Sequence, residues 1–107
     1  MALKKISKHE LKAIIEVTGR ISYIDFKTEL HDGIEEEILE LRIKWSNCII
    51  FVYERNLSMI KQLQKYKEND VVLLKGYFFA RWFPGAKSSL PIIEKVIEHN
   101  RLGVLTN

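Results

Sequence analysis

The feature that most constrains this chain is an alternation of apolar and polar residues with a period of two. From Leu39 to Trp45 every second residue is apolar, and the residues between them are Glu40, Arg42 and Lys44. Such alternation buries one face of an extended strand and leaves the other face in water, so it favours β-strand over helix. The chain is therefore predicted to be mostly β.

Five segments in all carry this β pattern or a dense β-branched and aromatic composition. In chain order they are Ala13–Ile24, Leu39–Trp45, Cys48–Tyr53, Val71–Phe83 and Ser89–Ile97. Turn-forming residues separate three neighbouring pairs, namely His31-Asp32-Gly33, Ser46-Asn47 and Pro84-Gly85. Gly19 and Gly76 lie inside strands, where glycine usually marks a bulge or a sharp bend.

One helix of about three turns is predicted between the third and fourth strands. Asn56 is a suitable N-cap, and apolar residues follow at the spacing of one helix face, namely Met59, Ile60, Leu63 and Tyr66. Asn69 is placed to adopt the left-handed conformation common after helix ends. The residues from Leu3 to Ile14 also fit a short amphipathic helix, and the sequence leaves that open.

The predicted order is thus β-β-β-α-β-β, which is the layout of the OB-fold, a small Greek-key barrel. We therefore predict an all-β fold with one helix: a five-stranded OB-fold barrel with its helix between strands three and four. A chain of 107 residues suits a single domain, with a core spanning about residues 13–100.

Composition excludes several classes of protein. The chain has no apolar run of membrane-spanning length and no signal-peptide core, so we expect a cytoplasmic protein with no membrane partner. Cys48 is the one cysteine, and the three histidines are scattered, so neither a disulfide nor a metal site is expected. No nucleotide-binding glycine loop or catalytic constellation is present, and we expect neither a cofactor nor enzymatic activity.

Charge is segregated along the chain although the net charge is only +3. Residues 31–54 contain six acidic and two basic residues, whereas residues 55–95 contain eight basic and three acidic residues. This distribution predicts a basic face and an acidic edge on one molecule. A basic face permits an anionic partner such as nucleic acid.

Two stretches resemble the bacterial single-stranded DNA-binding protein family. Ile15-Glu16-Val17-Thr18-Gly19-Arg20-Ile21 is similar to the opening strand of that family, and residues 67–78 (KENDVVLLKGYF) are similar to its segment entering strand four. Trp82-Phe83 stands where the family tends to carry a DNA-stacking tryptophan. The resemblance implies binding of single-stranded DNA by a homodimer or homotetramer.

The sequence departs from the family at two points. Asn69 replaces the usual glycine, which keeps the same backbone geometry accessible. The family's long tail with an acidic tip has no counterpart after Arg101, so its role in recruiting partners is not expected here.

Binding of single strands needs cations that follow the phosphates and flat rings that stack on the bases. If the family's inward positions are carried over, Val72, Leu74, Gly76 and Phe78 of the fourth strand face the core. In the third strand Cys48, Ile50 and Val52 face the core. The side chains left outside, together with the loop after strand four, form the candidate site: Arg20, Arg42, Lys44, Phe51, Tyr53, Lys75, Tyr77, Phe79, Arg81, Trp82, Phe83 and Lys87.

Each part of this site has an alternative interpretation. Tyr77 and Phe79 could pack against a second subunit, Phe51 could lie under the helix, and Arg42 and Lys44 could pair with Glu40 or its acidic neighbours. Trp45 fits the core or the barrel rim better than a stacking role. For the whole protein, the alternatives are an RNA or tRNA module, a replication-restart accessory protein, or a protein–protein adaptor that uses the same aromatic face.

Overall fold

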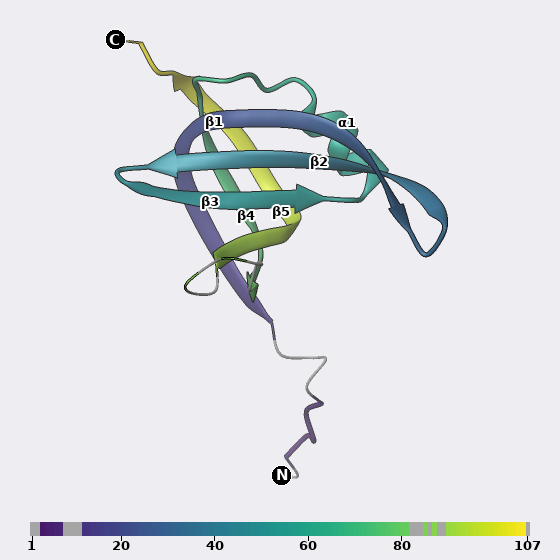
Figure 1. Ribbon diagram of the computed structural model, residues 1–107. Helices are drawn as coiled ribbons and strands as arrows, with labels where there is room; N and C mark the ends of the chain where they lie inside the picture. Colours follow the sequence, from purple (N-terminus) through teal and green to yellow (C-terminus); the bar gives the residue numbers. More distant parts are fainter. Residues whose placement is uncertain (1–2, 8–11, 82–84, 86, 88–89, 107) are drawn as a thin grey trace.

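The computed structural model describes residues 3–7, 12–81, 85, 87 and 90–106. Its five strands and one helix form a closed barrel, drawn in Figure 1. The elements are β1 (Ala13–His31), β2 (Ile34–Trp45), β3 (Cys48–Glu54), α1 (Leu57–Leu63), β4 (Asp70–Arg81) and β5 (Leu90–Val104). The described part contains no helix with the length and apolar character needed to cross a bilayer.

The strands are arranged in the order β1-β2-β3-β5-β4, and β4 returns to pair with β1. β3 and β5 run parallel, and the other neighbours in the barrel are antiparallel. β1 joins the two halves, because its residues 13–20 pair with β4 and its residues 20–31 pair with β2. This is the OB-fold predicted from the sequence, with its helix between strands three and four.

Gly19 and Gly76 allow strands to approach closely where the barrel bends. A Cβ atom on Gly19 would lie 2.7 Å from the carbonyl oxygen of Lys44, and one on Gly76 would lie 2.5 Å from that of Lys95. The ladder between β4 and β5 shifts register beside Gly76. The extra residue at this shift is Ile97 of β5, opposite Gly76 and not within β4, and the shift in β1 lies between Ile21 and Tyr23, after Gly19.

The core fills the barrel with aliphatic side chains from every strand and is closed at one end by α1. The buried positions of β2, β3 and β4 follow the predicted alternation, with Leu39, Leu41, Ile43, Ile50, Val52, Val72 and Leu74 all inside. Ile60, Leu63 and Tyr66 are also buried, as the helical spacing predicts. Inward and outward positions around the barrel wall are thereby fixed.

Local signals at the helix and the turns are largely confirmed. The Asn56 side chain accepts a hydrogen bond from the Met59 N–H at 3.0 Å and caps α1. Asn69 has a φ of 75°, the left-handed conformation expected for it, although it precedes β4 and does not end the helix. The helix is shorter than the three turns predicted, because the chain leaves it at Gln64 and buries Tyr66 from a turn.

Several boundaries differ from the sequence prediction. β1 continues seven residues past Ile24, and β5 runs to Val104, since both are held by a neighbouring strand after their alternation has faded. Cys48, predicted to be in the core, is exposed. It pairs with Trp45 beside the Ser46-Asn47 turn, at the outer end of the β2–β3 hairpin, where no core remains to cover it. Leu3–Ser7 form neither helix nor strand.

Candidate nucleic-acid interface

Three cross-strand partners on the outside of the barrel place a cation between two aromatic rings. Tyr23 on β1 pairs with Arg42 on β2, and Arg42 pairs with Phe51 on β3. The guanidinium carbon of Arg42 lies 4.3 Å from the Tyr23 ring centroid and 5.3 Å from the Phe51 centroid. Both distances are within the range of a cation–π contact.

A buried carboxylate holds Arg42 in this position. Glu40 is 3% exposed and accepts hydrogen bonds from Arg42 Nε and Lys27 Nζ, each at 3.0 Å. Arg42 Nη2 reaches the same carboxylate at 2.9 Å. The alternative that Arg42 pairs with Glu40 is therefore correct, and the pairing leaves the guanidinium plane in contact with the rings. Because the Arg42 side chain is already held in place, it loses less conformational entropy when a ligand binds.

Phe51 and Tyr53 extend this surface along β3. Their rings are parallel within 4°, with centroids 6.4 Å apart. Burial raises the pKa of Tyr53, and the charge of Glu40 raises it further. The hydrogen bond to Glu40 raises the pKa of Lys27. Near neutral pH this face therefore carries neutral tyrosines beside fixed cations. We call Tyr23, Arg42, Phe51 and Tyr53 the β1–β3 face.

Tyr23 is the residue of this face that sequence reasoning missed. Strict alternation from the buried Ile21 would turn Tyr23 into the core. The ladder shifts between Ile21 and Tyr23, so the extra residue Ser22 reverses the phase and Tyr23 faces outward. The Ser22 hydroxyl donates to the Arg42 carbonyl at 3.2 Å and braces the irregular step. The sequence did contain a signal for this irregularity. Ile21 and Ile24 are three positions apart, whereas two residues on the same face of a regular strand are an even number of positions apart.

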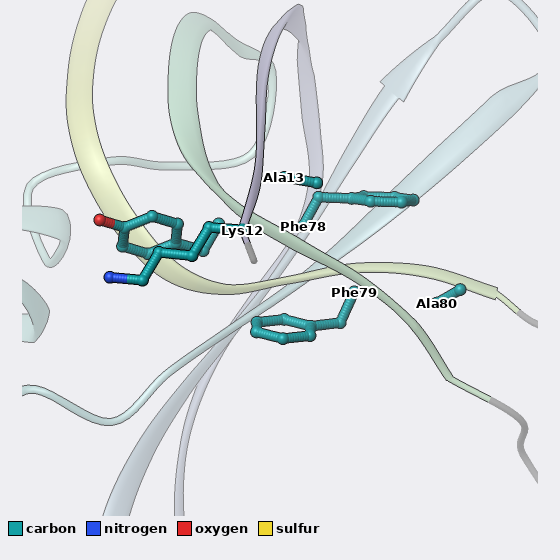
Figure 2. A pocket seen from close by; sticks show the side chains of 6 residues that line it. Lys12, Ala13, Phe78, Phe79 and Ala80 are labelled. Carbon is teal, nitrogen blue, oxygen red and sulfur yellow. The ribbon is translucent and has the colours of Figure 1, made fainter. Parts of the chain in front are cut away.

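A second aromatic group lies on β4 and the start of β1. An open hollow of about 450 Å³ is lined by Lys12, Ala13, Tyr77, Phe78, Phe79 and Ala80. Figure 2 shows the rings of Phe78 and Phe79 on opposite sides of β4. Lys12 Nζ lies 5.2 Å from the centroid of the Tyr77 ring, and Phe79 is 50% exposed. We call Lys12, Tyr77 and Phe79 the β4 patch.

β5 connects the β1–β3 face with the β4 patch. Phe51 pairs with Ile92 across β3 and β5, and Ile92 pairs with Phe79 across β5 and β4. Phe51 and Phe79 are thus two strand spacings apart, or about 10 Å along one row of side chains. Directly opposed residues point to the same side of a sheet, so Phe51 and Phe79 lie on the same side as Ile92. Ile92 itself is fully buried between them, whereas Phe79 is half exposed.

The basic side chains predicted for the site are spread more widely over the barrel than the aromatic ones. Lys44 is exposed between Arg20 and Ile49, one row from Arg42, and the Arg20 guanidinium donates to Asn69 at 3.3 Å. Lys75 stands in register between Glu16 and Glu98, which offsets its charge. Lys12 and Lys95 were missed, and Lys95 pairs in register with Tyr77.

Four predicted residues lie at or beyond the end of β4. Arg81 is the last residue of that strand, and its side chain lies outside the described part of the structure. Trp82 and Phe83 also lie outside the described residues, so their predicted role stays a prediction. Lys87 is exposed in the connection to β5.

The acidic and metal-ligating side chains of the described residues can be accounted for separately. Among the described residues, no group of three or more His, Cys, Asp or Glu side chains is placed to hold a metal ion. The buried carboxylates of Glu54 and Asp70 have structural partners. Glu54 accepts the N–H of Val96 at 2.8 Å, and Asp70 pairs with Arg101 at 3.1 Å.

Comparison with known proteins finds similarity in structure. No protein-family model and no curated protein sequence matches the chain. The structure is similar to the crystal structure of a small single-stranded DNA-binding protein from Streptomyces coelicolor, with a TM-score of 0.55. The superposition covers 84% of this chain and 92% of that chain at 11% sequence identity. The chain therefore has an OB-fold of the kind found in a single-stranded DNA-binding protein, as the sequence resemblance predicted.

Proposed function

We propose that this protein binds single-stranded DNA in an extended form, coats it and protects it, largely without sequence preference. The observation that carries the proposal is the outward row in which Arg42 lies between Tyr23 and Phe51, 4.3 and 5.3 Å from their ring centroids. Flat groups held in this way stack on any unpaired base, whereas the bases of a duplex already stack on one another. No catalytic role is part of this proposal.

The path of the strand follows from the two aromatic groups. Bases stack on the β1–β3 face and on Phe79 of the β4 patch, and the buried Ile92 lies between these two groups. Lys44, Lys12 and Lys95 flank this path and are exposed, so they are available to phosphates. The similarity to a single-stranded DNA-binding protein supports the same ligand. A homodimer or homotetramer, expected from the sequence resemblance, belongs to the proposal.

Anisotropy of a fluorescent oligothymidine tests the proposal, with a length of about 12 nucleotides to suit one OB-fold. Phe79→Ala removes a stacking ring and should weaken binding by about 1–3 kcal/mol, roughly 5- to 150-fold. Leu102→Ala is the control, because Leu102 is 52% exposed against 50% for Phe79 but lies near the end of β5, in neither of the two aromatic groups nor the β1–β2 hairpin. Its affinity should equal that of the unchanged protein.

Parallel titrations separate the alternatives. Affinity should fall as salt rises, and duplex DNA of the same length should bind more weakly than the single strand. An oligouridine that binds more tightly than oligothymidine would favour an RNA module. Absence of binding at low salt, or equal loss in Phe79→Ala and Leu102→Ala, would contradict the proposal.

A further inference from the structure

The part of the β1–β2 hairpin that projects from the barrel takes no part in the proposed interface. We call residues 26–38 the hairpin extension. β3 pairs with β2 from Leu39 onward, so within the described structure residues 27–31 and 34–38 pair only with each other. Figure 1 shows this ribbon projecting beyond the barrel near α1. A projecting two-stranded ribbon with open edges is a typical place for another chain to dock.

The hairpin extension exposes large apolar side chains. Leu30 is 75% exposed, Ile34 66% and Phe26 47%, and Leu57 at the start of α1 is 57% exposed. Phe26 and Leu30 share one face of the extension, Ile34 lies on the other face, and Leu57 belongs to the neighbouring α1. A group of exposed apolar side chains on one projecting element marks an interaction surface more often than singly scattered ones do.

Acidic residues accompany these apolar side chains. Leu30 and Glu35 are cross-strand partners, and Glu37 lies two positions along the same face. Residues 35–37 also line a hollow of about 390 Å³ together with Arg55 and Leu57. Glu36 pairs with Arg55 at 3.1 Å, whereas Glu35 and Glu37 are exposed. The complement of this surface is a segment that carries both apolar and basic side chains.

The chain itself contains such a segment. We call Leu3–Ser7, whose sequence is LKKIS, the arm. The arm is exposed and forms neither helix nor strand, with Leu3 94% and Ile6 63% exposed. In Figure 1 it lies outside the barrel, apart from the hairpin extension of its own chain. In the sequence Leu3 and Ile6 flank two lysines, so the arm carries the apolar and basic side chains that complement the apolar and acidic extension.

We propose that the arm of one copy docks on the hairpin extension of a second copy. Leu3 and Ile6 cover the apolar side chains around Leu30, while the two lysines face Glu35 and Glu37. Each copy carries both surfaces, so two copies exchange arms and close a dimer with two equal contacts. The contact involves neither the β1–β3 face nor the β4 patch and does not depend on nucleic acid.

A charge-exchange experiment tests this contact by sedimentation velocity without nucleic acid. One variant reverses the arm (Lys4→Glu with Lys5→Glu), and the other reverses the extension (Glu35→Lys with Glu37→Lys). The unchanged protein should assemble at low salt, with its dissociation constant rising at least about tenfold at ~0.5 M salt because the charges are screened. Each variant alone should sediment as a monomer.

Mixing the two variants is the decisive step. The reversed arm then meets the reversed extension, and the native arm of the other copy meets a native extension, so both contacts return and the mixture should assemble. Glu68→Lys with Glu98→Lys gives the same change in charge away from the extension and should assemble like the unchanged protein. Both of these glutamates are exposed.

Three outcomes would overturn the proposal. The first is a monomer for the unchanged protein at every concentration and salt, and the second is assembly that neither reversal weakens. The third is a mixture that stays monomeric while the unchanged protein assembles. Because the measurement contains no nucleic acid, none of these outcomes decides whether the protein binds single strands.

Discussion

Arg42 combines two roles in one side chain. It neutralises the buried Glu40, with Nη2 2.9 Å from the carboxylate, and it places a flat cation over Tyr23 and Phe51. Lysine keeps a positive charge but lacks the planar guanidinium. The first role therefore survives an Arg42→Lys change, and the second role is lost.

We predict that Arg42→Lys weakens binding to oligothymidine by about three- to tenfold, the loss of one planar cation contact. The free energy of unfolding should fall by about 1 kcal/mol at most, since Glu40 keeps cationic partners. Arg55→Lys is the matched control, because Arg55 pairs with Glu36 away from the interface. Anisotropy titrations and urea unfolding measure the two quantities. Unchanged affinity in Arg42→Lys would remove this residue from the site.

His99 forms two side-chain hydrogen bonds that favour its neutral form. Its Nδ1 lies 2.7 Å from the Tyr66 hydroxyl and its Nε2 lies 2.9 Å from Gln62 Oε1. The amide oxygen of Gln62 requires a donor, so Nε2 carries the proton and Nδ1 accepts from Tyr66. Burial lowers the pKa of His99, and the charge of Lys65 lowers it further. Folding therefore favours the neutral ring.

We predict that the free energy of unfolding falls as the pH falls below about 6.5, the ordinary pKa of histidine. The unfolded chain takes up a proton there that the folded chain binds only at lower pH. In His99→Gln this fall should be smaller, which urea unfolding between about pH 7.5 and about pH 5 measures. An identical pH profile for the variant and the unchanged protein would show that His99 does not contribute.

At the scale of the elements, glycine positions decide how closely the strands pack. A methyl group on Gly76 would meet the Ile93 side chain and lie 2.5 Å from the Lys95 carbonyl oxygen, which is backbone and yields little. Gly103, near the end of β5, has nothing within 4 Å of the same position. The two glycines lie on neighbouring strands and provide a matched pair.

We predict that Gly76→Ala lowers the free energy of unfolding by about 1–3 kcal/mol, the usual cost of overpacking. Gly103→Ala should change it by about 0.5 kcal/mol or less, as for most surface substitutions. Urea unfolding measures both. Equal stability in the two variants would mean that close approach at Gly76 is not required.

The same elements show what a local pattern can and cannot predict. The phases of β2, β3 and β4 were predictable because each strand has one face in a continuous core. The phase of β1 was not, since Ser22 adds one residue and turns Tyr23 outward. The lengths of β1, β2 and β5 were underestimated, because pairing with a neighbour extends β1 to His31, starts β2 at Ile34 and extends β5 to Val104.

At the scale of the whole molecule, the order of elements was enough to predict the barrel. Five strands with a helix after the third leave few ways to close a sheet, and the OB-fold is one of them. The aromatic residues of the proposed site were predicted in two pieces, Phe51 with Tyr53 and Tyr77 with Phe79. Their connection through Ile92 could not be predicted, because it depends on the register of β5 against both β3 and β4.

The central claim is that a single strand lies across the β1–β3 face and the β4 patch, in contact with Tyr23, Arg42, Phe51 and Phe79. The most direct test is NMR of the labelled protein during titration with oligothymidine. We predict saturable shifts in these four residues, with residues of α1 and the hairpin extension unchanged. Saturable shifts confined to α1 or the hairpin extension, or no shifts at all, would contradict the claim.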